Sequence, residues 1–181
     1  MTSPLKDPLL LAGKAITFFM QAAMAFGALV LVGVSVALLF YQDSIMDEFI
    51  ADTGNPDFVF PLLPLLGVFL IGLIILSALF VFFGKLRAMI NTVGEGDPFQ
   101  PANADRLSLM GWLMLGVQLL FLPAAALGAK LAELAEEMDN VNVSLDGGLD
   151  LSGMLMVIIL FILARVFRHG AAMREDLEGT V

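Results

Sequence analysis

Four long stretches without a charged residue limit what this chain can fold into. They cover residues 15–42, 58–84, 107–129 and, before Arg165, 151–164. About 20 apolar residues cross a bilayer as a helix. The 181-residue chain is 59% hydrophobic and 15% charged, which leaves too little polar sequence to cover four apolar helices in water. The sequence therefore predicts an all-α membrane protein with four transmembrane helices embedded in the lipid bilayer.

The fourth stretch is short and needs a separate argument. Fourteen uncharged residues precede Arg165, and Val166 and Phe167 follow it. An arginine near a helix end extends its apolar stem along the helix and brings its charge to the membrane surface. We therefore expect the fourth span to cover residues 151–167.

Basic residues predict the orientation of the spans. Eight of the nine Lys and Arg residues fall in segments that alternate spans place on one side, and Lys130 is the exception. The eight are Lys6, Lys14, Lys85, Arg87, Arg106, Arg165, Arg168 and Arg174. Basic residues accumulate on the cytoplasmic side of membranes. Both termini, an inner loop at 85–106 and an inner tail at 168–181 are thus expected in the cytoplasm, with outer loops at 43–57 and 130–150.

Short connections between successive spans predict an up-down-up-down four-helix bundle that forms a single domain. Two outer segments carry an apolar stripe at helical spacing, which predicts short amphipathic helical extensions. The stripes are Ile45, Met46, Phe49 and Ile50 in one segment and Leu127, Leu131, Leu134 and Met138 in the other. We expect the two to pack as a cap. The functional alternative is an acidic surface that senses a cation or a cationic peptide.

A weak calcium-loop pattern lies in the second outer loop. Asn142, Ser144, Asp146 and Asp150 fall at positions 1, 3, 5 and 9 of such a loop. Position 12 is Gly153, where a bidentate Glu is needed, and position 1 lacks an acid. A polar turn is the simpler interpretation, and we expect no metal site.

Composition also removes several classes of function. The net charge of −9 gives no attraction for DNA or RNA. The chain has no Cys and a single histidine, His169, so we expect neither a cofactor nor an enzyme. Ionisable residues that would support coupled transport are missing from the middle of the spans. Gln21 and Gln118 are the strongest polar groups there and are expected to hydrogen-bond between helices.

Two polar segments on the predicted inner side have distinctive sequences. Gly94 and Gly96 favour tight turns in the loop, and Pro98 and Pro101 interrupt helices. Asn103 suits the N-cap of the third span, and Phe99 is expected either to anchor the loop at the end of the bundle or to lie at the membrane interface. In the tail, Glu175, Asp176 and Glu178 are candidate ion-pair partners for Arg106 and Arg174.

These segments resemble domain-of-unknown-function family 2975. The loop motif consists of Gly96, Pro98, Phe99, Asn103, Arg106, Leu107 and Gly111, and the tail motif of Arg174, Glu175, Asp176, Glu178, Thr180 and Val181. The resemblance implies a small four-span protein of the bacterial inner membrane. Members are often encoded beside a helix-turn-helix regulator, which implies that the membrane protein controls or tethers a cytosolic transcription factor. The tail departs from the family at Leu177 and Gly179.

We therefore expect a non-enzymatic regulatory membrane protein. It would sense an envelope or lipid state and bind a helix-turn-helix regulator through its inner loop and tail. Two alternatives remain open: a small-molecule or ion conductor or carrier built from a homo-oligomer and lined by Gln21 and Gln118, and a structural subunit of a membrane complex.

Overall fold

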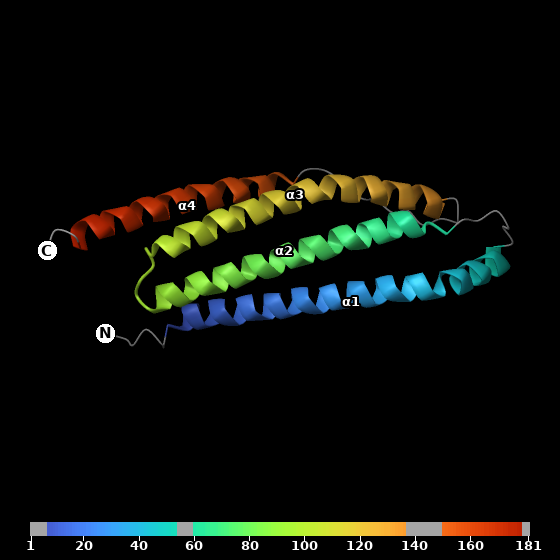
Figure 1. Cartoon of the computed structure of the whole chain (residues 1–181), viewed down its shortest axis with the longest axis horizontal. Helices are drawn as coiled ribbons and strands as arrows, with labels where there is room; N and C mark the ends of the chain where they lie inside the picture. Colours follow the sequence, from blue (N-terminus) through green and yellow to red (C-terminus); the bar gives the residue numbers. More distant parts are fainter. Residues whose placement is uncertain (1–6, 54–59, 137–149, 179–181) are drawn as a thin grey trace.

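The computed structural model describes residues 7–53, 60–136 and 150–178, and its regular elements are four α-helices. They are α1 (Pro8–Thr53), α2 (Leu62–Gly94), α3 (Pro101–Glu136) and α4 (Leu151–Glu178). Each is long and apolar enough to cross a membrane, which confirms the predicted all-α class with four spans. Successive helices run in opposite directions (Figure 1). We call the end where residues 95–100 join α2 to α3 the loop end; α1 begins and α4 ends there.

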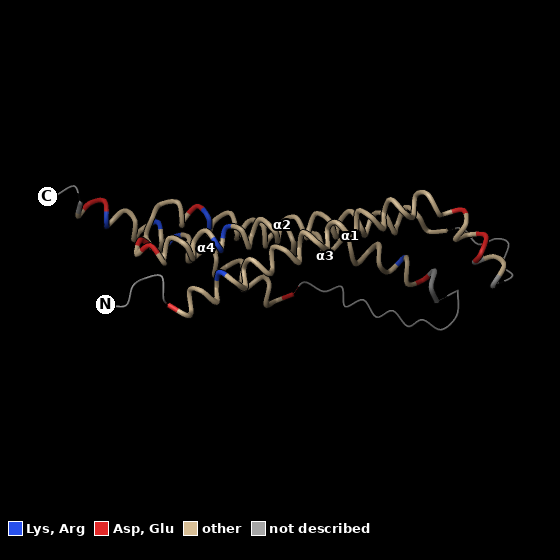
Figure 2. Tube along the Cα trace, turned by 90° about the horizontal axis from the view of Figure 1, so that it is seen from below, with Lys and Arg blue, Asp and Glu red and all other residues tan. Residues whose placement is uncertain are grey.

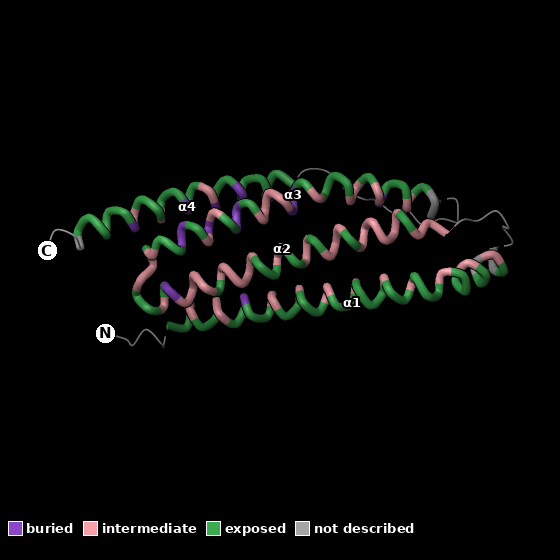
Figure 3. Tube along the Cα trace, viewed as in Figure 1, coloured by how far each residue is buried: buried purple, intermediate pink, exposed green. Residues whose placement is uncertain are grey.

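The surface of the molecule is that of a protein embedded in lipid. Phe40, Leu63 and Leu151 expose more than four-fifths of their area, and exposed residues run along the whole of α1 and α4 (Figure 3). Most charged residues lie toward the two ends of the molecule, an acidic residue at the start of α4 lies nearer its middle, and the middle of α1 and α2 carries none (Figure 2). In a bilayer this apolar surface contacts acyl chains, so it requires no further protein cover.

The helices pack in sequence order. Helix α1 packs on α2, α2 on α3 and α3 on α4, whereas no comparable packing joins α1 to α4 among the described residues. The result is an open array rather than a closed ring of four helices. Lipid explains the difference from a closed bundle, since an apolar helix face in a bilayer gains little from burial against protein.

The best-packed region lies between α3 and α4 near the loop end. Leu107, Met110, Leu160 and Ala164 are its buried members. Partly buried side chains surround them, namely Phe82, Leu86, Met89, Met114 and Phe167. This region fixes the position of α4 relative to the α2–α3 connection, and hence the geometry of the loop end.

The helices extend beyond the predicted spans at both ends. The inner loop expected at 85–106 shrinks to residues 95–100, because α2 continues to Gly94 and α3 starts at Pro101. A proline is favoured at the first helical position, where its missing N–H is not needed. On the opposite side, α1 continues to Thr53 and α3 to Glu136, so helical extensions are present in both of the segments that were predicted to carry them.

Candidate functional site

The α2–α3 connection is a tight turn held by backbone hydrogen bonds. The N–H of Glu95 donates to the Asn91 carbonyl at 3.0 Å, and the N–H of Asp97 donates to the Thr92 carbonyl at 3.0 Å. Gly96 between them has a φ of +81°, a backbone conformation that favours glycine. The turn places Asp97 and Phe99 in contact with the end of α4.

Asn103 is the buried centre of this turn, with 0% of its surface exposed. Its Nδ2 donates to the Thr92 Oγ1 at 2.8 Å and to the Pro98 carbonyl at 2.8 Å. Its Oδ1 accepts a hydrogen bond from the Arg106 guanidinium at 2.7 Å. One side chain thus ties the end of α2, the turn and the first turns of α3 together.

The prediction that Asn103 caps α3 is wrong. The helix already begins at Pro101, so Asn103 lies inside its first turn, and its N–H donates to the Gln100 carbonyl at 2.9 Å. Because its side chain turns back toward Thr92 and Pro98, it joins two helices instead of capping one.

Asp97 connects the turn to α4. One carboxylate oxygen accepts a hydrogen bond from the Gln100 amide at 2.9 Å, and the other is paired with the Arg174 guanidinium. The two side chains of the ion pair are 31% and 48% exposed. Neither Asp97 nor this pairing was predicted, since the tail acids were the expected partners of Arg174.

Phe99 supplies the apolar contact between the turn and α4. Its ring centroid lies 5.4 Å from that of Phe167. The ring also covers Gly170, where an added Cβ would come within 2.7 Å of it. Phe99 therefore anchors the turn against Phe167 and Gly170 of α4, although 42% of the residue stays exposed.

The last turns of α4 carry acidic side chains in solvent. Glu175 and Asp176 are exposed, and the side chain of Glu178 lies outside the described ones. About two turns earlier in α4, Arg168 pairs with Asp105 of α3 at 3.6 Å, and both side chains are well exposed. We call the surface formed by residues 95–100 and 170–177 the loop–tail surface.

The structure gathers most of the predicted inner-face residues at this end. Those brought into the turn or its contacts are Gly96, Pro98, Phe99, Asn103, Arg106 and Arg174. Sequence reasoning missed Thr92, Asp97, Phe167 and Gly170. Gly170 did carry a signal, because a glycine inside a helix often marks close approach of another group.

The calcium candidates do not form a described site. Asn142, Ser144 and Asp146 lie outside the described residues. Asp150 caps α4, with its carboxylate oxygens accepting from the N–H groups of Ser152 and Gly153 at 3.0 Å each. Among residues 7–53, 60–136 and 150–178, no three His, Cys, Asp or Glu side chains come together to hold a metal ion.

The two glutamines of the spans lie in different helix interfaces. Gln21 of α1 donates from Nε2 to the Phe80 carbonyl of α2 at 3.3 Å. Gln118 of α3 is 3% exposed and lies against Gly153 of α4, and its Oε1 has no hydrogen-bond partner in the described part of the chain. Both therefore pack between helices, and within one chain they do not line a common path.

Comparison with known proteins identifies one family. Residues 48–181 match the family model described as "Protein of unknown function (DUF2975)". This match covers the end of α1 and the whole of α2, α3 and α4, and it includes the whole loop–tail surface. No match was found among curated proteins or among solved structures.

Proposed function

The chain belongs to the DUF2975 family of proteins of unknown function, and we propose that it is a non-enzymatic regulatory protein of the bacterial inner membrane. In this proposal the loop end faces the cytoplasm, in keeping with the clustering of basic residues on that side. The loop–tail surface then binds a cytosolic helix-turn-helix regulator.

The observation that carries the proposal is the assembly of one surface from two distant segments. Asp97 and Arg174 join the turn to the end of α4 by an ion pair, and Phe99 rests on Gly170 beside them. Both contacts lie at the exposed end of the helices and leave polar and apolar groups accessible. A surface of this kind is available to a soluble protein, unlike the lipid-facing sides of the helices.

The chemistry of the loop–tail surface suits a basic partner. Glu175 and Asp176 place carboxylates along the exposed end of α4. Met173 and Leu177 add apolar area, being 52% and 71% exposed. Partly exposed apolar side chains anchor interfaces, while charge complementarity directs association. DNA-binding domains carry basic surfaces. The acidic loop–tail surface therefore favours a DNA-binding partner over an acidic protein.

The same surface offers a means of regulation. An exposed ion pair contributes about 0–1 kcal/mol, so a small displacement of α4 relative to the turn is enough to separate Asp97 from Arg174. Helix α4 packs on α3 on one side and exposes apolar side chains along much of its length, which lipid covers in this proposal. We propose that a change in the membrane shifts α4, alters the loop–tail surface and releases or captures the regulator.

Co-purification tests the proposal. The tagged protein is extracted in mild detergent, and the proteins that accompany it are identified and quantified by mass spectrometry. We expect a helix-turn-helix protein in stoichiometric amount. Phe99→Ala or deletion of residues 173–181 should remove it, while Phe40→Ala, on the exposed lipid-facing side of α1, should retain it. Unchanged recovery in both loop–tail variants would refute the proposal.

A further inference from the structure

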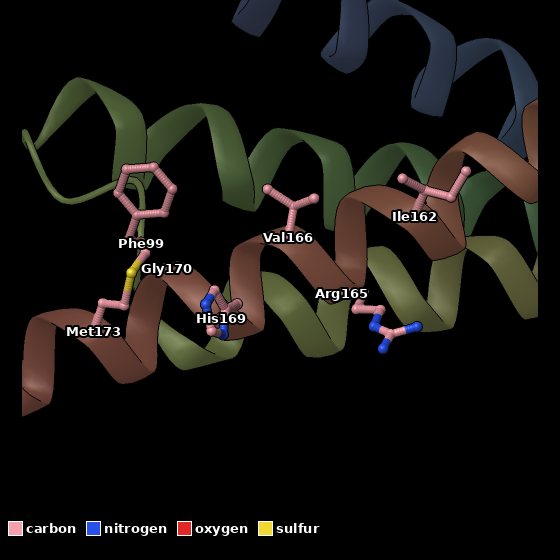
Figure 4. A pocket seen from close by; sticks show the side chains of 7 residues that line it. All are labelled: Phe99, Ile162, Arg165, Val166, His169, Gly170 and Met173. Carbon is pink, nitrogen blue, oxygen red and sulfur yellow. The ribbon is translucent and has the colours of Figure 1, made fainter.

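A groove of about 790 Å³ runs along the exposed side of α4. All of its lining residues belong to α4 except Phe99, whose ring closes the groove at the loop end (Figure 4). The ring can take this place because it lies directly over Gly170. The groove is therefore a lipid-side feature of one helix with a wall contributed by the α2–α3 turn.

The groove has a basic part and an apolar part. Arg165 and His169, one helical turn apart, supply the basic groups. Ile162 and Val166 supply the apolar wall and are 56% and 55% exposed. Figure 4 shows Ile162 and Val166 extending to one side of α4 and Arg165 to the other, with His169 between them.

Arg165 differs from its neighbour Arg168 in its surroundings. Arg168 pairs with Asp105 at 3.6 Å, whereas Arg165 has no acidic side chain within 4.0 Å in the described part of the chain. Its guanidinium carries a full positive charge and five N–H donors. An anion that reaches the groove thus finds donors not already engaged with a carboxylate.

The position along α4 indicates the kind of anion. Arg165 ends the uncharged stretch 151–164 and so marks the boundary between apolar and polar surface. Ile162 lies about one turn deeper on the same helix. A ligand that fills the groove must therefore be anionic at the boundary and apolar below it, which is the chemistry of a phospholipid.

We infer that this groove binds an anionic phospholipid of the leaflet at the loop end. Arg165 and His169 donate hydrogen bonds to the headgroup phosphate, and one acyl chain lies against Ile162 and Val166. Basic pockets beside transmembrane helices bind anionic headgroups in this way. The inference does not depend on the regulator, because the groove opens toward lipid and the test contains no partner protein.

Native mass spectrometry of the detergent-solubilised full chain measures this binding directly. The protein is titrated with phosphatidylglycerol and, separately, with phosphatidylcholine of the same acyl chains. We expect phosphatidylglycerol to bind more tightly. The double variant Arg165→Gln/His169→Gln should weaken phosphatidylglycerol binding by at least about fivefold, because it removes the attraction of one arginine, worth about 1 kcal/mol, together with the N–H donor of His169.

Two further variants make the result specific. Arg168→Gln removes the same charge three residues away but from a paired arginine, and should leave phosphatidylglycerol binding unchanged. Val166→Trp fills the apolar part of the groove and should weaken both lipids while retaining the basic groups. Both positions are exposed, so neither change disturbs the packed region between α3 and α4.

The outcomes that overturn the inference are distinct. Equal binding of the two lipids would show that the protein does not select an anionic headgroup. An equal loss in Arg168→Gln and in the double variant would show that any arginine at this end of α4 attracts the lipid and that the groove is not a specific site. Inorganic phosphate is added in competition, and we expect it not to displace phosphatidylglycerol. Displacement would show an ion site that does not use the apolar wall, and the lipid assignment would be wrong.

Discussion

Asp97 and Arg174 stand 77 residues apart in the sequence and form an ion pair that joins the α2–α3 turn to the end of α4. The contact is made in solvent, beyond the packed region between α3 and α4. The pair therefore adds a local tie between the turn and the last turns of α4, whose position is set mainly by the packed region, and it contributes little to the stability of the whole fold.

We expect Asp97→Asn and Arg174→Gln each to lower the free energy of unfolding by about 0.2–1 kcal/mol, the range for exposed ion pairs. Asn at 97 keeps an oxygen for the Gln100 amide. Hydrogen exchange at the end of α4 should accelerate more than exchange elsewhere. The charge swap Asp97→Arg/Arg174→Asp should restore part of the protection, and no restoration would show that the pair does not hold α4.

Asn103 should be the most sensitive polar residue of the loop end. Asn103→Leu removes hydrogen bonds to Thr92, Pro98 and Arg106 and leaves buried groups unpaired, which costs about 2–4 kcal/mol at about 0.5–1.5 kcal/mol per bond. The control Gln100→Ala loses one side-chain bond and should cost about 1 kcal/mol. Equal effects of the two changes on thermal unfolding in detergent would contradict the central role of Asn103.

Gly170→Ala should displace Phe99, because the new Cβ would meet its ring at 2.7 Å. Overpacking of this kind costs about 1–3 kcal/mol. The same substitution at Gly116, where the added Cβ would meet no atom of another helix within 4 Å, should be neutral or stabilising by up to about 1 kcal/mol. Phe99→Ala should abolish the difference between the two sites; a difference that persists would place the strain elsewhere.

Gln118 and Gly153 should be coupled in a double-mutant cycle. An added Cβ at Gly153 would overlap the Gln118 amide nitrogen, so Gly153→Ala forces a buried side chain to move. We expect it to destabilise the protein by about 1–3 kcal/mol alone and by much less in a Gln118→Ala background. Additive effects in chemical unfolding would show that the two residues do not touch.

The number and type of helices were predictable because they depend on chain properties that need no tertiary information. A stretch such as 58–84 has no charge and is long enough to cross a bilayer as a helix. The open arrangement was not predictable, since apolar faces in lipid do not specify whether another helix or an acyl chain covers them.

The sequence allowed most residues of the loop end to be predicted, but not the contacts that they make. Glycine and proline marked the turn, and Phe99 was recognised as an anchor because an aromatic between turn residues needs a place to pack. The acceptor of Arg174 depends on how far α4 extends past α3, which places Asp97 beside it. Asn103 failed as a predicted cap because Pro101 began the helix two residues earlier.

Photo-crosslinking in cells tests the central claim most directly. A photoreactive amino acid is placed at position 175 on the loop–tail surface and, as a control, at position 43 toward the opposite end of α1. The account predicts that a soluble helix-turn-helix protein becomes attached from position 175, not from position 43, and not when Phe99→Ala is also present. The absence of a soluble protein at position 175, or the same attached proteins from both positions, would contradict it.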